Sequence, residues 1–132
     1  MSITYQWRGG FENPEVEMLH AAGFDHAPLA TADWVTTLTT HSLGWVCARD
    51  DAGLVGFVNV AWDGATHAFV LDTLVARRAE RQGVGTRLIA IATENARAAG
   101  CEWLHVDFDE HLRPFYFDAC GFTPTDAGLI RL

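Results

Sequence analysis

The sequence predicts an α/β protein, in which strands form a sheet and helices pack on it. Three observations lead to this class. The chain has 132 residues, of which 49% are hydrophobic, enough for one core and too apolar for a disordered chain. Two apolar runs, residues 44–49 and 54–62, flank the turn sequence DDAG and indicate a β-hairpin. Residues 69–100 then read as a strand, a glycine loop and a helix.

The chain begins with a predicted strand and a predicted helix. Residues 3–7 alternate enough for a strand, and a glycine pair follows them. Asn13 and Pro14 indicate a helix start, because an amide cap precedes proline at the first helical position. We expect this helix to stop at Gly23 and to turn Val16, Met18 and Leu19 inward.

A second helix is expected over residues 31–40, with Asp33 near its start and Trp34, Val35 and Leu38 on its buried side. The hairpin follows it, and a second turn at Asp63 and Gly64 leads into the next strand. Asn59 is unusual inside the apolar second arm of the hairpin. It either faces a pocket or satisfies a backbone group, and both interpretations stay open.

Residues 69–75 are predicted to form the central strand, covered on both faces, because only Asp72 and Thr73 interrupt their apolar run. A helix should begin near Gly85 and end at Gly100, where glycine permits a left-handed conformation. Its predicted inner face recurs at three- and four-residue steps and consists of Leu88, Ile91, Ala92, Ala96 and Ala99.

The loop between that strand and helix has the composition of an anion site. Gly83 and Gly85 permit a tight turn with nothing projecting above it, and the first amides of the helix lack intrahelical partners. Four of the nine basic residues of the chain fall in or beside this loop, namely Arg77, Arg78, Arg81 and Arg87. We therefore predict a phosphate ligand, and specifically a diphosphate.

Other interpretations of the loop are a Walker loop, a dinucleotide-binding loop and a plain turn. A Walker loop requires lysine, and this chain contains none. A dinucleotide fingerprint requires a small residue where Leu88 stands, and a larger parallel sheet than this chain can build. A plain tight turn without a ligand remains an alternative.

Bulk properties exclude several classes of protein. A net charge of −8 disfavours a nucleic-acid surface and favours a cationic partner such as an amine. Three cysteines without paired spacing predict free thiols and a reducing, cytoplasmic location. We find neither a hydrophobic leader nor an apolar run of about 18 residues, so we expect no membrane contact.

The spacing of the loop, the helix and the segment PFYFDACGF resembles that of the GNAT superfamily of acetyl-CoA-dependent N-acetyltransferases. The family's coenzyme motif, Gln/Arg-x-x-Gly-x-Gly/Ala, is similar to ERQGVG here, with Glu80 as the departure. The resemblance covers roughly residues 54–122. It implies one domain over residues 1–132, with a mixed, mostly antiparallel sheet flanked by helices on both faces, and leaves a homodimer open.

The resemblance also implies a coenzyme site. The strand amides near Leu74 and Val75 would bind the pantetheine arm, in a slot opened by a splayed strand over residues 101–108. Asp109 stands where the family often has an asparagine that contacts the arm. The diphosphate would lie on the loop residues Arg81, Gln82, Gly83, Val84, Gly85, Thr86 and Arg87.

Candidate catalytic residues follow from the same resemblance. Tyr116 matches the family's general-acid tyrosine, which protonates the leaving thiolate. The base is either Asp72 or His105, or a water relay from Asp109 or Glu110. Because strand residues alternate in direction, the direction of Asp72 depends on a local bulge. An imidazole at position 105 suits a base at neutral pH.

The acceptor is expected to be a primary amine on a small molecule or peptide, in a pocket roofed by the two N-terminal helices. Candidate pocket residues are Phe24, His26, Trp34, His41 and Asn59, with ordinary core packing as the alternative for each. Two other functions stay open. One is a non-catalytic acyl-CoA-binding module. The other is a metal or interaction domain, for which His105, Asp107, Asp109 and His111 form a possible ligand row, although we expect no metal.

Overall fold

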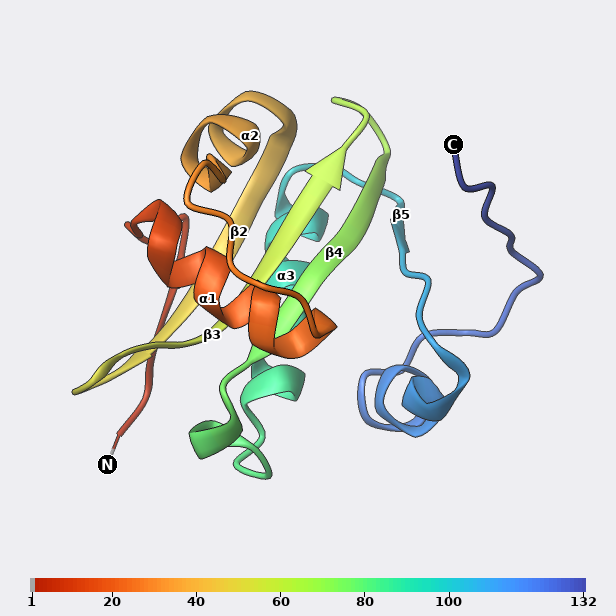
Figure 1. Cartoon of the computed structure of the whole chain (residues 1–132). Helices are drawn as coiled ribbons and strands as arrows, with labels where there is room; N and C mark the ends of the chain where they lie inside the picture. Colours follow the sequence, from red (N-terminus) through yellow and green to blue (C-terminus); the bar gives the residue numbers. More distant parts are fainter. Residues whose placement is uncertain (1) are drawn as a thin grey trace.

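The computed structural model describes residues 2–132. Figure 1 shows a twisted sheet with α1 and α2 on one face and α3 on the other. The elements in chain order are β1 (Thr4–Trp7), α1 (Asn13–Phe24), α2 (Trp34–His41), β2 (Ser42–Asp50), β3 (Gly53–Trp62), β4 (His67–Val75), the short helix η1 (Arg77–Ala79), α3 (Val84–Ala98), β5 (Trp103–His105), and the short helices η2 (Glu110–Leu112) and η3 (Pro114–Ala119).

The five strands of the sheet lie in the order β1-β2-β3-β4-β5. The first four are antiparallel to their neighbours, and β5 runs parallel to β4. The predicted hairpin is β2–β3, and the Asp50 carboxylate accepts hydrogen bonds from the backbone N–H groups of Ala52 and Gly53 in its turn. The expected mixed, mostly antiparallel sheet with helices on both faces is confirmed.

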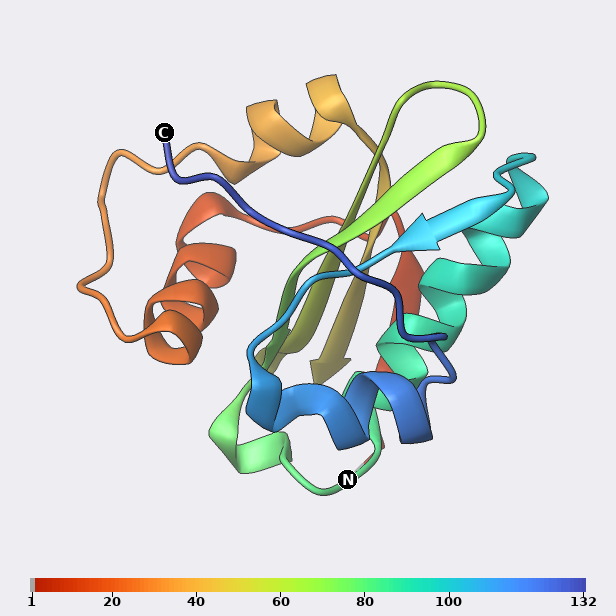
Figure 2. The ribbon, with the colours of Figure 1, turned by 90° about the vertical axis from the view of Figure 1, so that its right-hand side faces the viewer.

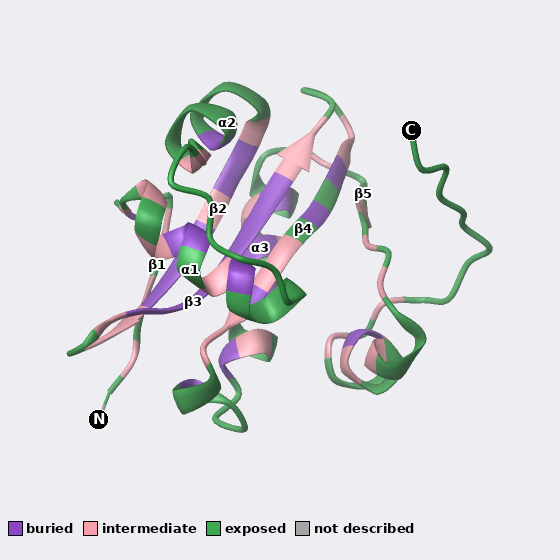
Figure 3. Ribbon diagram, viewed as in Figure 1, coloured by how far each residue is buried: buried purple, intermediate pink, exposed green. Residues whose placement is uncertain are grey.

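The sheet buries side chains on both faces, most completely along β2 and β3 (Figure 3). On the α3 side, Leu88 and Ile89 pack against Val58 and Val60. On the other side, Val16 of α1 and Leu38 of α2 belong to a second cluster that includes Phe57, Leu74 and Cys47. The two clusters fix the helices on opposite faces of β4, the strand that carries the candidate site.

Helix α3 approaches β3 closely because Gly56 has no side chain. A Cβ atom built at Gly56 would lie 2.8 Å from Cγ1 of Val84 and 3.2 Å from Cδ1 of Leu88. We therefore expect Gly56→Ala to lower the free energy of unfolding by about 1–3 kcal/mol, the usual cost of overpacking. Urea denaturation measures this, with Gly10→Ala as the control, because a Cβ at Gly10 would meet nothing within 4 Å. An equally stable Gly56→Ala variant would contradict the packing.

Helix α1 is capped differently from its prediction, and α2 begins at Trp34 rather than at the predicted residue 31. The side chain of Glu15 accepts a hydrogen bond from the Glu12 N–H, so Glu12, and not Asn13, is the capping residue of α1. The Asn13 side chain instead accepts from the Val35 N–H and donates to Asp33. Asp33 caps α2, as expected. Asn13 is therefore used to join the two helices.

Several predicted details of the helices are wrong. Helix α1 continues past Gly23 and ends where Asp25 takes a left-handed conformation, with a φ of 54°. The side chains of Met18 and Val35 are exposed, because each lies on the solvent side of its helix. Ala99 is exposed because it is the C-cap residue, beyond the last residue of α3, whereas Ile89, which was not predicted to face inward, is buried.

Strand β5 is shorter than expected and β4 is less covered. Only His67, Ala68 and Phe69 of β4 pair with β5, whereas a strand over residues 101–108 was predicted. Phe69 and Leu71 are 38% and 41% exposed, so the expectation that both faces of β4 are covered is wrong there. Beyond residue 69, the two strands diverge, as Figure 1 shows.

Candidate active site

A β-bulge in β4 sets the direction of Asp72. Phe57 pairs with Leu74 and Asn59 pairs with Leu71, so β4 carries one residue more than β3 across this stretch. Asp72 takes a φ of 55°, which is uncommon for a residue other than glycine. The side chain of Asp72 consequently reaches His20 of α1 and Asn59 of β3. The bulge directs this carboxylate to the face that α1 covers.

Tyr116 reaches the same stretch of β4 from η3. Its hydroxyl donates a hydrogen bond to Oγ1 of Thr73 at 3.1 Å, and its ring stacks on Phe108 with centroids 4.6 Å apart. The residue is 6% exposed, and burial raises the pKa of the phenol. Tyr116 therefore stays protonated at neutral pH and can donate its proton. Asp72 and Thr73, the partner of Tyr116, are thus neighbouring residues of β4.

The glycine loop presents free backbone amides. Within the described residues 2–132, no protein atom accepts a hydrogen bond from the backbone N–H groups of residues 82–86. Gly83 is required by its φ of 75°, and a Cβ there would meet nothing within 4 Å. Gly85 is required for packing, because its Cβ would lie 3.0 Å from the Phe115 ring. The loop is therefore open toward solvent and closed toward η3.

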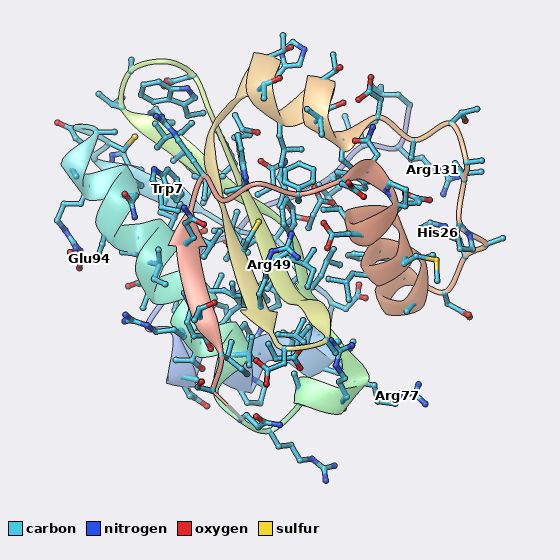
Figure 4. All side chains as sticks on the ribbon, turned by 90° about the vertical axis from the view of Figure 1, so that its left-hand side faces the viewer. Trp7, His26, Arg49, Arg77, Glu94 and Arg131 are labelled. Carbon is cyan, nitrogen blue, oxygen red and sulfur yellow. The ribbon has the colours of Figure 1, made fainter. Side chains whose placement is uncertain are left out.

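The arginines near the loop differ in what they contact. Arg78 forms an ion pair with Asp50 at 3.1 Å, and the Arg87 guanidinium lies 5.9 Å from the centroid of the Tyr5 ring on β1. The N–H of Arg87 already donates to the Gly83 carbonyl. Arg81 is exposed, and the labelled Arg77 extends away from the sheet (Figure 4). The arginines that were predicted to form one basic cluster therefore extend in several different directions.

His20, which the sequence analysis missed, is the centre of a cluster with Phe24, His26, Trp34 and Asp72, which we call the His20 cluster. Its ring centroid lies 4.6 Å from that of Phe24 and 5.0 Å from that of Trp34. Its Nε2 lies 3.4 Å from Oδ1 of Asp72, and its Nδ1 lies 2.7 Å from Nε2 of His26. Four side chains that were predicted as site residues therefore surround His20, which was not predicted. They are Phe24, His26, Trp34 and Asp72. The available signal was its position one helical turn after buried Val16, on the inner face of α1.

Glu17 was also missed, and it ties together the segments beside the His20 cluster. Its carboxylate accepts hydrogen bonds from the Leu29 N–H at 2.8 Å and from Nε1 of Trp34 at 2.9 Å. These bonds lower the pKa of the carboxyl group. Glu17 stays charged at neutral pH and ties α1 to the following loop and to α2.

Other predicted residues lie apart from this group. His105 faces His67, with Nε2 and Nδ1 2.8 Å apart, and its ring stacks on Phe69. His41 is exposed at the end of α2, and Asp109 directly precedes η2. Within residues 2–132, no group of three or more His, Cys, Asp or Glu side chains is arranged to hold a metal ion.

Asn59 contacts Asp72 of the His20 cluster rather than a backbone group. It accepts a hydrogen bond from the Ser42 hydroxyl and lies 3.4 Å from Oδ2 of Asp72. Two shallow hollows of about 220 and 280 Å³ occur elsewhere, beside α3 and beside α1. Neither hollow contains Asp72 or Tyr116. The candidate site is therefore identified from its side chains and from the divergence of β4 and β5, and not from a cavity.

The sheet with its diverging strands β4 and β5, together with the glycine loop ahead of α3, defines the class of protein. The family model of the GNAT acetyltransferases matches residues 7–122, and the chain belongs to this family. No curated protein matches the chain significantly. Among the described residues, no helix is long and apolar enough to cross a bilayer.

Solved structures of GNAT-like proteins share the fold along the whole chain. A GNAT-family acetyltransferase from Streptococcus pneumoniae is 23% identical, with a TM-score of 0.79, over 99% of this chain and 98% of that one. An acetyltransferase from Trypanosoma brucei is 19% identical, with a TM-score of 0.80, over 99% of each chain. Glucosamine-6-phosphate N-acetyltransferase from Arabidopsis thaliana is 13% identical, with a TM-score of 0.77, over 98% of each chain. At these identities the likeness concerns the fold alone.

Proposed function

We propose that this GNAT protein transfers an acetyl group from acetyl-CoA to a primary amine, by direct attack of the amine on the thioester. The observation that carries this proposal is the arrangement of side chains at the bulge of β4. Asp72 faces α1 there, and the neighbouring Thr73 accepts a hydrogen bond from the Tyr116 hydroxyl. The Asp72 carboxylate, which can attract a cationic acceptor, and the Tyr116 phenol, which can protonate a leaving thiolate, therefore lie at the same short stretch of β4.

The residues present fit the coenzyme. The free amides of residues 82–86 form a concave group of donors suited to a diphosphate. Within residues 2–132, β4 has no partner strand on its β5 side beyond Phe69, which leaves that edge, with Leu74 and Val75, for the amides of a pantetheine arm. Asp109, which directly precedes η2, is assigned the contact with the arm in this proposal. Acetyl-CoA supplies an activated acetyl thioester.

The residues of the chain supply the proton transfers. An alkyl amine is mostly protonated at neutral pH and must lose a proton before it attacks. The Asp72 carboxylate attracts the ammonium form, and the net charge of −8 favours its approach. Tyr116, kept protonated by burial, gives its proton to the sulfur as the carbon–sulfur bond breaks. His105 contacts His67 and Phe69 at the start of β4, apart from Asp72 and Tyr116, so we assign it no part in these transfers.

The setting is consistent with this activity. The three cysteines are free thiols, as a reducing compartment such as the cytoplasm allows. The acceptor in this proposal is a small molecule or a peptide. The alternative is an acyl-CoA-binding module without turnover, which Glu80 favours, because a carboxylate directly before the loop weakens anion binding.

Thiol release from acetyl-CoA, measured over a panel of primary amines, tests the proposal. We expect release that depends on amine concentration, and a rise in melting temperature with acetyl-CoA alone. Stabilisation without release on any amine would support the binding module. Absence of both effects would reject acyl-CoA as a ligand.

A further inference from the structure

We infer that His20 is the base that removes the proton from the acceptor amine, and that His26 positions His20 and shares the proton. This inference rests on the proposed function. It follows from a continuous line of polar atoms, formed by Asp72, His20, His26 and the Ala27 carbonyl. The successive distances are 3.4, 2.7 and 2.9 Å.

The Ala27 carbonyl fixes the protons along this line. A carbonyl oxygen only accepts hydrogen bonds, so Nδ1 of His26 must carry a hydrogen. In the neutral ring, Nε2 of His26 is then an acceptor, and Nδ1 of His20 must donate to it. The remaining nitrogen, Nε2 of His20, is left with a lone pair that faces the Asp72 carboxylate.

The neutral pair of rings therefore has one open proton position, between Nε2 of His20 and Oδ1 of Asp72. Two acceptors face each other across 3.4 Å there, and an added proton turns this contact into an ion pair. The same proton can be shared outward, because the hydrogen between the two rings can move onto Nε2 of His26. His26 is exposed on the loop after α1, where Figure 4 shows its side chain at the molecular surface.

The surroundings of His20 favour this role. Phe24, Trp34 and His26 surround the ring, which restricts its orientation. Glu17, the nearby carboxylate of α1, is already occupied by Leu29 and Trp34. On β3, Asn59 is uncharged and bonds the other oxygen of Asp72. Asp72 is therefore the carboxylate that pairs with His20.

The transfer balances in atoms and electrons. An N–H bond of the acceptor ammonium breaks and an H–Nε2 bond forms on His20. The electron pair left on the amine forms the bond to the acetyl carbon, and the carbon–sulfur bond breaks toward sulfur. The proton of Tyr116 joins the sulfur. The acetylated nitrogen releases its second N–H proton to solvent, which leaves a neutral amide, and the solvent restores the phenol. Once the product has left, Nε2 of His20 releases its proton to solvent, and both rings return to their neutral tautomers.

Two acceptor amines that differ in their protonation at neutral pH distinguish a catalytic base from a residue with a structural role. Ethylamine is protonated at neutral pH, whereas trifluoroethylamine is largely unprotonated and needs no base. We expect His20→Gln to slow thiol release with ethylamine about 100-fold, the low end for general-base catalysis, and to leave the trifluoroethylamine rate nearly unchanged. His26→Gln should show the same selectivity with a smaller loss. The control is His41→Gln, which changes an exposed histidine outside the line. Equal losses on both amines, or no loss, would overturn the inference.

A second measurement decides the proton arrangement without any turnover. Nitrogen-15 spectra of the imidazole rings at about pH 8.5, above the range in which histidine usually changes charge, should show hydrogen on Nδ1 of both His20 and His26. Hydrogen on Nε2 of a neutral His20 would overturn the inference even if the protein acetylates amines. Conversely, the expected tautomers without thiol release on either amine would reject the proposed activity and leave the proton line in place.

Discussion

Replacing Tyr116 by phenylalanine should lower the turnover number for amine acetylation by about 100-fold or more, the usual range for loss of a general acid. The ring keeps its stacking on Phe108, so the fold and the slot beside β4 stay intact. Loss of the hydrogen bond to Thr73 should cost only about 1 kcal/mol of stability. Steady-state thiol release measures the rate, and calorimetric titration should show unchanged affinity for acetyl-CoA.

Two matched variants accompany this test. Tyr5→Phe removes the other tyrosine hydroxyl of the chain, on β1 at the far edge of the sheet, and should leave the rate unchanged. Thr73→Val removes the partner of the phenol but keeps its proton, so most of the activity should persist. A Tyr116→Phe enzyme that is as fast as the wild type would show that another group protonates the thiolate.

Replacing Gly83 by aspartate should weaken acetyl-CoA binding at least about tenfold relative to asparagine at the same position, because the added carboxylate repels a diphosphate. Asparagine and aspartate are the non-glycine residues that best tolerate a positive φ, which is 75° here. A side chain at Gly83 would also meet nothing within 4 Å of its Cβ. Both variants should therefore fold.

Calorimetric titration of the two Gly83 variants compares nearly isosteric side chains that differ in charge. The Gly83→Asn variant controls for the strain of a left-handed residue and for the bulk of the side chain. Equal affinities of the two variants for acetyl-CoA would show that the diphosphate lies away from the loop.

The parts of the fold that were predictable are those that local patterns specify. The DDAG turn between two apolar runs specified β2–β3, and the apolar period of residues 84–98 specified α3. The ends of α1 were less predictable because they depend on neighbours. The sequence indicates that Asn13 caps α1. In the structure its side chain instead accepts a hydrogen bond from the Val35 N–H of α2, and the Glu15 side chain accepts one from the Glu12 N–H.

The candidate site was predictable where a motif carries it and unpredictable where packing does. Tyr116 and the loop around Gly83 stand in recognisable sequence contexts. The direction of Asp72 depends on an extra residue in the register between β3 and β4, which no local pattern shows. His20 acquires its partners only when α1 packs on β4 and the following loop folds back.

The basic loop shows the same limit. In sequence, four arginines gather beside the glycines, which suggests one cationic site. In the fold, Arg78 pairs with Asp50 and Arg87 lies over Tyr5. The free backbone amides of residues 82–86 are therefore the more reliable basis for an anion site, since their direction follows from the start of α3 itself.

Backbone amide NMR during coenzyme titration tests the central claim most directly, namely that the amides of residues 82–86 hold the diphosphate of acetyl-CoA. Coenzyme A should shift the amide signals of these residues strongly. Pantetheine, which lacks the diphosphate and the nucleotide, should shift signals along β4 near Leu74 and Val75 and leave the loop unchanged. If coenzyme A binds without moving the amide signals of residues 82–86, the account is contradicted.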